Sequence, residues 1–175
     1  NNPGANTEAF TADGWFKTGD MACYVEHGYI MIGDRKKDMI LTGSENVYSV
    51  EVERALCDHP SVQTASVFGI PNDILGEIVQ AVVVLNPDME ASFRELQRHC
   101  MSLMSDYKCP RQIMFMEKGE LPLTGSGKVS KAHLRKICLE MGSKGLAEPC
   151  QVLEMEWVPS RPVGSKHAVP KATYC

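Results

Sequence analysis

The residues with the clearest chemical potential lie in a glycine-containing segment, Thr124-Gly125-Ser126-Gly127-Lys128. Its glycines let the backbone approach a ligand, and its lysine carries a flexible positive charge. A phosphate-cradling P-loop is excluded, because Pro122 stands where the first glycine is required and Val129 offers no hydroxyl for magnesium. The pattern G-x-G-x-x-G fails too, since Ser130 occupies its third glycine position. Lys128 is therefore a candidate for contact with an anionic substrate. The alternative is that Lys128 is only a solvent-exposed loop residue without a role in binding.

A second group of charged residues lies near the N-terminus, where Asp20 follows Gly19 and Arg35 opens a short basic run. A carboxylate accepts strong hydrogen bonds from two vicinal hydroxyls, and a guanidinium is a planar donor suited to phosphate. An acid, a guanidinium and a loop lysine in this order are what an enzyme handling a nucleotide and a carboxylate needs. The alternatives are a turn-capping role for Asp20 and a surface ion pair of Arg35 with Asp34 or Asp38.

Three motifs recur in a characteristic order: GWFKTGD at residues 14–20, GDRKKD at 33–38 and PLTGSGKV at 122–129. Together they resemble the C-terminal part of an adenylate-forming enzyme, of the acyl-CoA synthetase and ligase superfamily. The resemblance covers roughly residues 5–140. It implies that the chain is a fragment and that the large N-terminal adenylation domain is missing.

The resemblance implies roles for the candidate residues. In this family a lysine at the position of Lys128 holds the carboxylate and the α-phosphate of ATP in line and stabilises the developing negative charge. The position of Asp20 binds the ribose hydroxyls, and that of Arg35 contacts ribose and phosphate. Lys37 occupies the hinge about which the C-terminal domain rotates between two half-reactions. An exposed linker lysine is the alternative for Lys37.

The same resemblance assigns Gly43, Ser44 and Glu45 to the approach path of the CoA or pantetheine thiol. The chain departs from the family twice here, with Ser44 where a second glycine is common and Ser49 where proline is common. A serine limits backbone freedom if position 44 requires a positive φ.

The resemblance implies formation of an acyl-adenylate from ATP and a carboxylic acid, with Mg²⁺ bound mainly by the missing N-terminal domain. The segments KKDMI and ENVY are closest to those of fatty or medium-chain acyl synthetases, so a fatty or related acid is the expected substrate. The acyl group then passes to CoA. One alternative is a loading unit of a multidomain polyketide or peptide synthase, which acylates the phosphopantetheine of a carrier protein. A non-catalytic binding module that keeps the fold is another. The phosphate loop and acyl pocket of the family are absent from these 175 residues, so the isolated chain is expected to be inactive.

The expected fold is α+β, a small mobile C-terminal domain of helices packed on a short β-sheet. Residues 1–36 are predicted to be the tail of the large domain, 37–141 the C-terminal domain, and 142–175 a linker or the start of a further domain. Residues 152–158 alternate like a strand and weakly resemble the opening strand of polyketide synthase modifying regions. The patterns predict a hairpin at 22–25 and 29–32, strands at 62–68, 78–85 and 112–116, and helices at 50–59, 91–104 and 130–141.

Several local expectations accompany these elements. Ser49 is predicted to cap the first helix, and a turn-rich loop is predicted to open at Gly69. The helical patterns place three cysteines among buried apolar residues, namely Cys57, Cys100 and Cys138. They also turn the following side chains inward: Val52, Ala55, Leu56, Phe93, Leu96, Leu103, Leu134, Ile137 and Met141.

Composition limits the remaining possibilities. The chain is 43% hydrophobic and 23% charged with a net charge of −4, which gives no support for nucleic-acid binding. Seven scattered cysteines without a C-x-x-C pair are poor evidence for disulfides or zinc and favour the cytoplasm or another reducing compartment. The five histidines show no ligand spacing, so no metal site is predicted. No signal peptide or transmembrane segment is predicted from the apolar pattern.

Overall fold

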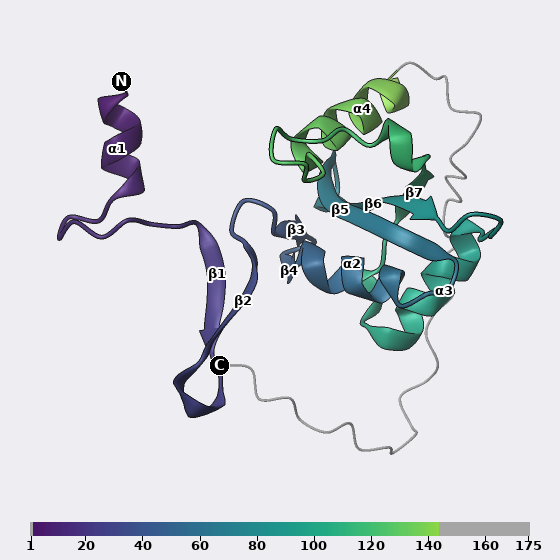
Figure 1. Cartoon of the computed structure of the whole chain (residues 1–175), viewed down its shortest axis with the longest axis horizontal. Coiled ribbons are helices and arrows are strands. Elements are labelled where there is room, and N and C mark those ends of the chain that lie inside the picture. The colour runs from purple at the N-terminus through teal and green to yellow at the C-terminus, as the bar shows by residue number, and fades with distance from the viewer. Residues whose placement is uncertain (1, 144–175) are drawn as a thin grey trace.

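A computed structural model describes residues 2–143 and has an N-terminal arm and a larger α+β unit (Figure 1). The predicted strand at 152–158 lies outside the described residues, as does the predicted tail from residue 144 onward. The arm contains α1 (Pro3–Ala9), β1 (Asp20–Tyr24), a 3-10 turn (Glu26–Gly28) and β2 (Ile30–Arg35). The larger unit confirms the predicted α+β class, with β3 (Ile40–Thr42), β4 (Glu45–Val47), α2 (Ser49–Cys57), β5 (Val62–Asn72), β6 (Gly76–Leu85), α3 (Phe93–Leu103), β7 (Gln112–Phe115) and α4 (Lys131–Ser143).

The arm forms the predicted hairpin, in which β1 and β2 pair antiparallel from Tyr24 and Ile30 at the turn to Asp20 and Arg35 at the open end. The turn contains a left-handed residue, His27, at φ 64°. Large apolar side chains of the hairpin are exposed; Tyr24 is 80% and Ile32 68% accessible. A two-stranded sheet of this kind is marginal alone in water.

The sheet of the larger unit is built around the long hairpin of β5 and β6, with β7 parallel to β6 and the short β3–β4 hairpin beyond the start of β6. The predicted loop from Gly69 is wrong, because β5 continues to Asn72 and pairs with β6 throughout, Ile70 facing Ile78. Among the described strands β5 pairs only with β6. Its outer edge therefore tolerates Pro71, which has no N–H to donate.

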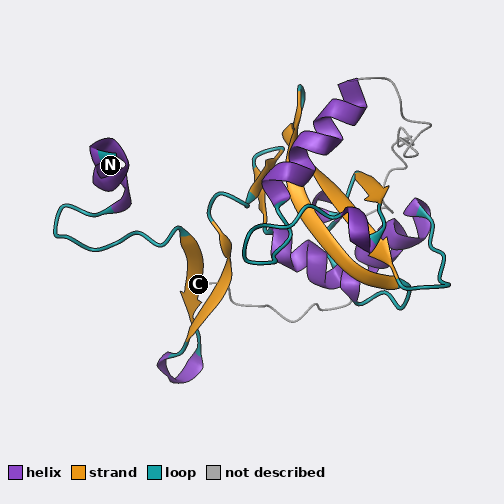
Figure 2. Ribbon diagram, turned by 45° about the horizontal axis from the view of Figure 1, so that its top comes forward, coloured by secondary structure: helices purple, strands orange, loops and turns teal. Residues whose placement is uncertain are grey.

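Helices cover both faces of the sheet (Figure 2). On one face α2 and α3 bury a large apolar cluster, in which Val52, Leu56 and Leu96 are fully buried. On the other face α4 places Leu134 against the β5 and β6 side chains Phe68 and Val82. Alternation along the strands produces this division, since adjacent residues of a strand point to opposite faces. None of the helices in the described range combines the length and apolar character that crossing a bilayer requires.

The burial pattern confirms most of the predicted inward positions and corrects three of them. Cys57 is exposed, because it is the last residue of α2 and lies beyond the buried Leu56. Leu103 ends α3 and is 55% exposed. Met141 is 43% exposed, since the apolar cluster under α4 ends at Cys138.

Candidate functional site

The segment that carries Lys128 is a short hairpin-like loop between two bridged residues, Leu123 and Val129. The Thr124 N–H donates to the Lys128 carbonyl at 2.7 Å, and the Gly127 N–H donates to the Thr124 carbonyl at 2.9 Å. The Lys128 N–H donates to the Thr124 hydroxyl at 3.2 Å. Gly127 has φ +77°, a conformation that favours glycine. These bonds order the loop while leaving the Lys128 side chain exposed.

The loop is attached to the sheet through α4, which follows it directly. The Ser130 N–H donates to the Pro122 carbonyl at 2.8 Å, which closes the base of the loop. Val129 and Leu121 pack against the cluster of Phe68, Val82 and Leu134. No ion pair of the Lys128 ammonium is found among the described residues, so its charge is available to a ligand.

The strand register brings Asp20 and Arg35 together at the open end of the β1–β2 hairpin. Arg35 Nε lies 3.7 Å from Asp20 Oδ1, and the two side chains are 61% and 34% exposed. The ion pair predicted as an alternative for Arg35 therefore exists, but with Asp20 and not with Asp34 or Asp38. In the turn before β1 the Asp20 N–H donates to the Thr18 hydroxyl at 3.2 Å. Both charged groups remain accessible to a ligand.

Lys37 lies in the exposed turn that joins β2 to β3, between the arm and the larger unit (Figure 1). The turn is held by the Asp38 N–H, which donates to the Arg35 carbonyl at 2.9 Å. The Lys36 N–H donates to the Gly19 carbonyl at 2.8 Å. This position fits a hinge, and the hinge role of Lys37 stays a prediction.

Gly43 and Ser44 form the two-residue turn of the β3–β4 hairpin, with φ of 56° and 69°. Position 44 thus has the positive φ that favours glycine, and Ser44 adopts it at a steric cost of about 1–2 kcal/mol. The turn is docked by the Gly43 N–H, which donates to the Leu75 carbonyl at 2.9 Å. Gly43, Ser44 and Glu45 are all exposed, as a thiol approach path requires.

The structure adds a polar network that the sequence reasoning missed. Asp34 is 6% exposed, and its carboxylate accepts the Ser49 hydroxyl at 2.8 Å and the Val50 N–H at 3.4 Å. The fully buried Ser49 hydroxyl accepts in turn from Lys131 Nζ at 2.6 Å. Lys131 Nζ also lies 2.7 Å from Glu53 Oε1. Asp34, Ser49 and Lys131, named the Ser49 bridge below, therefore connect three separate elements.

The bridge corrects the predicted role of Ser49. Tyr48 is the N-cap residue of α2, and it makes no side-chain capping bond, while Ser49 is the first residue of the helix. One of the N-terminal N–H groups that have no partner within the helix, that of Val50, donates instead to Asp34. The only sequence signal for this arrangement is the departure at position 49, where the family commonly has proline.

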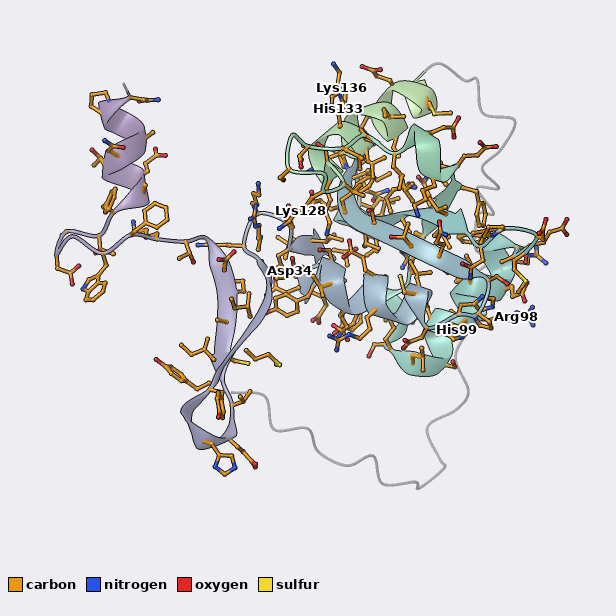
Figure 3. The ribbon with its side chains drawn as sticks, viewed as in Figure 1. Asp34, Arg98, His99, Lys128, His133 and Lys136 are labelled. Carbon is orange, nitrogen blue, oxygen red and sulfur yellow. The ribbon has the colours of Figure 1, made fainter. Side chains whose placement is uncertain are left out.

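The bridge lies beside the candidate residues. Asp34 precedes Arg35 and accepts its backbone N–H at 2.7 Å, and Lys131 begins the helix after the Lys128 loop. Figure 3 shows Asp34 and Lys128 on the side of the larger unit that adjoins the arm. The structure thus connects the Asp20–Arg35 pair with the Lys128 loop. The exposed Gly43–Ser44 turn is not part of the Ser49 bridge; its N–H contact goes to Leu75.

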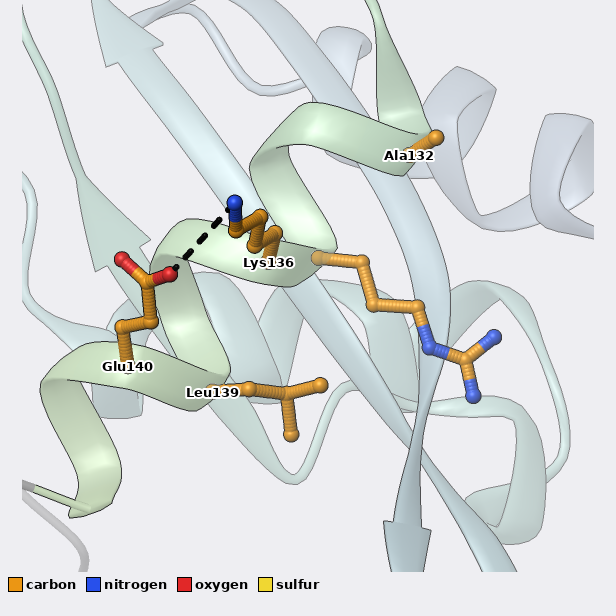
Figure 4. Close-up of a pocket in the computed structure, with 5 residues that line it drawn as sticks. Ala132, Lys136, Leu139 and Glu140 are labelled. Carbon is orange, nitrogen blue, oxygen red and sulfur yellow. Dashed lines mark ion pairs between the residues drawn. The ribbon is translucent and has the colours of Figure 1, made fainter.

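Two further features carry no candidate residue. A shallow hollow on α4 is lined by Ala132, Arg135, Lys136, Leu139 and Glu140, with a Lys136–Glu140 ion pair at 3.8 Å (Figure 4). Within residues 2–143 no group of three or more His, Cys, Asp or Glu side chains is arranged to hold a metal. None of the described residues is assigned to Mg²⁺.

Comparison with known proteins places the chain in a family. Residues 51–128 match the AMP-binding enzyme C-terminal domain. An acyl-CoA ligase of Aspergillus fumigatus, sidI, is 40% identical over 164 residues, which cover 88% of this chain and 28% of that relative. The chain spans about a quarter of the length of the curated relatives it matches.

Solved structures of related enzymes support the same family. ATP-bound MatB from Rhodopseudomonas palustris is 32% identical with a TM-score of 0.72, covering 77% of this chain and 26% of MatB. Apo MatB from the same organism is 33% identical over the same shares, with a TM-score of 0.60. The chain therefore belongs to the adenylate-forming enzymes and carries their AMP-binding enzyme C-terminal domain.

Proposed function

We propose that the chain is the C-terminal part of an ATP-dependent acyl-activating ligase. In the first half-reaction a carboxylate oxygen bonds to the α-phosphorus of ATP, the bond to the bridging oxygen breaks, and pyrophosphate leaves. In the second, a thiol sulfur bonds to the acyl carbon, the bond to the AMP oxygen breaks, and the thiol proton is released. The observation that carries the proposal is the connection of the accessible Asp20–Arg35 pair with the projecting Lys128.

Each residue has a role that its geometry supports. Lys128 carries an ammonium without an ion pair among the described residues, next to the turn of an ordered loop, where it can hold carboxylate and α-phosphate in line. Asp20 can accept the two ribose hydroxyls, and Arg35 can contact ribose and phosphate. Lys37 is the pivot. The exposed Gly43–Ser44 turn and Glu45 line the approach of the thiol.

We propose CoA as the thiol acceptor and a fatty or related acid as the acyl donor. The names of the relatives support the acceptor, and a long-chain-fatty-acid CoA ligase of Mycobacterium tuberculosis is among them at 38% identity. Transfer to a carrier-protein phosphopantetheine is the competing outcome of an acceptor assay.

Five free cysteines within the described residues agree with a reducing compartment such as the cytoplasm.

The exposed apolar side chains of the β1–β2 hairpin support a larger parent protein. Tyr29, Ile30 and Met31 are between 55% and 71% accessible although they point to both faces of the hairpin, and apolar side chains exposed in this number are normally covered. At equal coverage, the chain matches ATP-bound MatB more closely than apo MatB. This difference supports the proposal that the structure described here corresponds to the nucleotide-bound form of the parent protein.

The test uses the complete protein and ATP–pyrophosphate exchange with a panel of carboxylic acids. Asp20→Ala is expected to raise the KM for ATP about tenfold or more, because hydrogen bonds to a charged group are lost. Asp13→Ala, a change at an exposed carboxylate of the same arm, is the matched control. The isolated 175-residue chain is expected to show no exchange. Unchanged KM in Asp20→Ala, or activity of the isolated chain, would contradict the proposal.

A further inference from the structure

The Ser49 hydroxyl joins two parts of the proposed site that are far apart in the sequence. On one side it donates to Asp34, the residue before Arg35. On the other side it accepts from Lys131, the first residue of the helix that follows the Lys128 loop. A buried hydroxyl that donates one bond and accepts another in this way fixes the two segments relative to each other.

The bridge spans the predicted hinge. Asp34 lies before Lys37 in the chain, whereas Ser49 and Lys131 lie after it. A rotation about Lys37 would therefore separate the Asp34 carboxylate from the Ser49 hydroxyl. It would also remove Asp34 from the N-terminus of α2, where its charge is favourable because the helix dipole is positive there.

The helix itself does not require a serine at position 49. Proline is well suited to the first position of a helix, because the N–H that it lacks has no partner within the helix. Tyr48 has φ −85° and ψ 121°, which is the backbone region that a residue before proline adopts. The hydroxyl of Ser49 is therefore explained by its two hydrogen bonds and not by helix formation.

We infer that Ser49 is a positioning residue for adenylation. The Ser49 bridge holds the segment with Arg35 and the loop with Lys128 in the arrangement seen here, and it opens when the domain turns toward thiol transfer. The inference deepens the proposed function and rests on it for the identity of the two half-reactions. Lys131 keeps its ion pair with Glu53, which like Ser49 belongs to α2, so only the hydrogen bonds from Ser49 and Val50 to Asp34 have to break when the bridge opens.

The first test uses the 175-residue chain and does not depend on enzyme activity. Trypsin cleavage after Lys36 requires local opening of the hinge turn, so its rate reports the fraction in which the bridge is open. Ser49→Ala and Ser49→Pro are expected to cleave there about tenfold faster, with cleavage after Lys118 unchanged. Ser61→Ala, at another buried serine, is the matched control.

A double-mutant cycle makes the test specific. Asp34→Ala is expected to accelerate cleavage after Lys36 like Ser49→Ala, and the double variant is expected to be no faster than either, because both remove one interaction. Rates equal to the unsubstituted chain, or additive effects of the two substitutions, would overturn the bridge.

The second test uses the complete protein and separates the half-reactions. Ser49→Ala is expected to lower the kcat of acyl-adenylate formation about tenfold while leaving thioester formation from supplied acyl-adenylate unchanged or faster. Equal losses in both half-reactions would refute the positioning role. Absence of adenylation in the unsubstituted protein would instead refute the proposed function, and the trypsin result would still decide whether the bridge exists.

Discussion

Truncation of Leu134 tests the attachment of the Lys128 loop to the sheet. Leu134 is fully buried between α4 and the β5 and β6 side chains Phe68 and Val82. Leu134→Ala removes three carbons, worth about 2.4 kcal/mol at about 0.8 kcal/mol for each buried CH₂. Incomplete collapse around the cavity adds to this, so we expect a loss of about 3 kcal/mol in the free energy of unfolding.

A matched control lies on the same helix, where Leu139 is 42% exposed. Leu139→Ala is expected to cost less than about 1 kcal/mol, because less area is lost and alanine favours a helix slightly more. Thermal unfolding followed by circular dichroism should show a decrease of roughly 10 °C for Leu134→Ala and a much smaller one for Leu139→Ala. Equal decreases would refute the assignment of α4 to the second apolar cluster.

Three further predictions concern thiols and left-handed residues. Burial raises the pKa of Cys100 to about 11. Burial also raises the pKa of Cys109, to about 12, and the nearby Cys100 adds to this shift. Both stay protonated at neutral pH, so mass spectrometry should find iodoacetamide reacting with them far more slowly than with the exposed Cys57; similar rates would contradict their burial. Gly127→Ala should lower the free energy of unfolding in urea by about 1–2 kcal/mol, because its positive φ is strained for alanine while its surroundings are open; a stabilised variant would count against the loop geometry. Ser44→Gly should raise the free energy of unfolding by up to about 1 kcal/mol, because glycine adopts the positive φ of position 44 without strain. A lower free energy of unfolding would contradict the left-handed conformation of this residue.

The sequence predicted the elements of the site better than their connections. Two β-prone runs that flank a glycine-containing turn predicted the hairpin, and the register seen in the structure pairs Asp20 with Arg35. The Ser49 bridge could not be predicted, because Lys131 lies 82 residues from Ser49 and meets it only through tertiary packing. The predicted loop at Gly69 failed for a similar reason, since pairing with β6 overrides the local preference of a Gly-Ile-Pro-Asn segment.

The most direct test of the account is the effect of Lys128→Ala on the two half-reactions of the complete protein. Lys136→Ala, at an exposed lysine on α4, is the matched control. Lys128→Ala is expected to lower the rate of acyl-adenylate formation at least a hundredfold, as when about 3 kcal/mol of transition-state stabilisation is removed. Thioester formation from supplied acyl-adenylate should stay within a few-fold of the unsubstituted protein. Unchanged adenylate formation, or an equal loss in both steps, would contradict the central claim that Lys128 acts in adenylation.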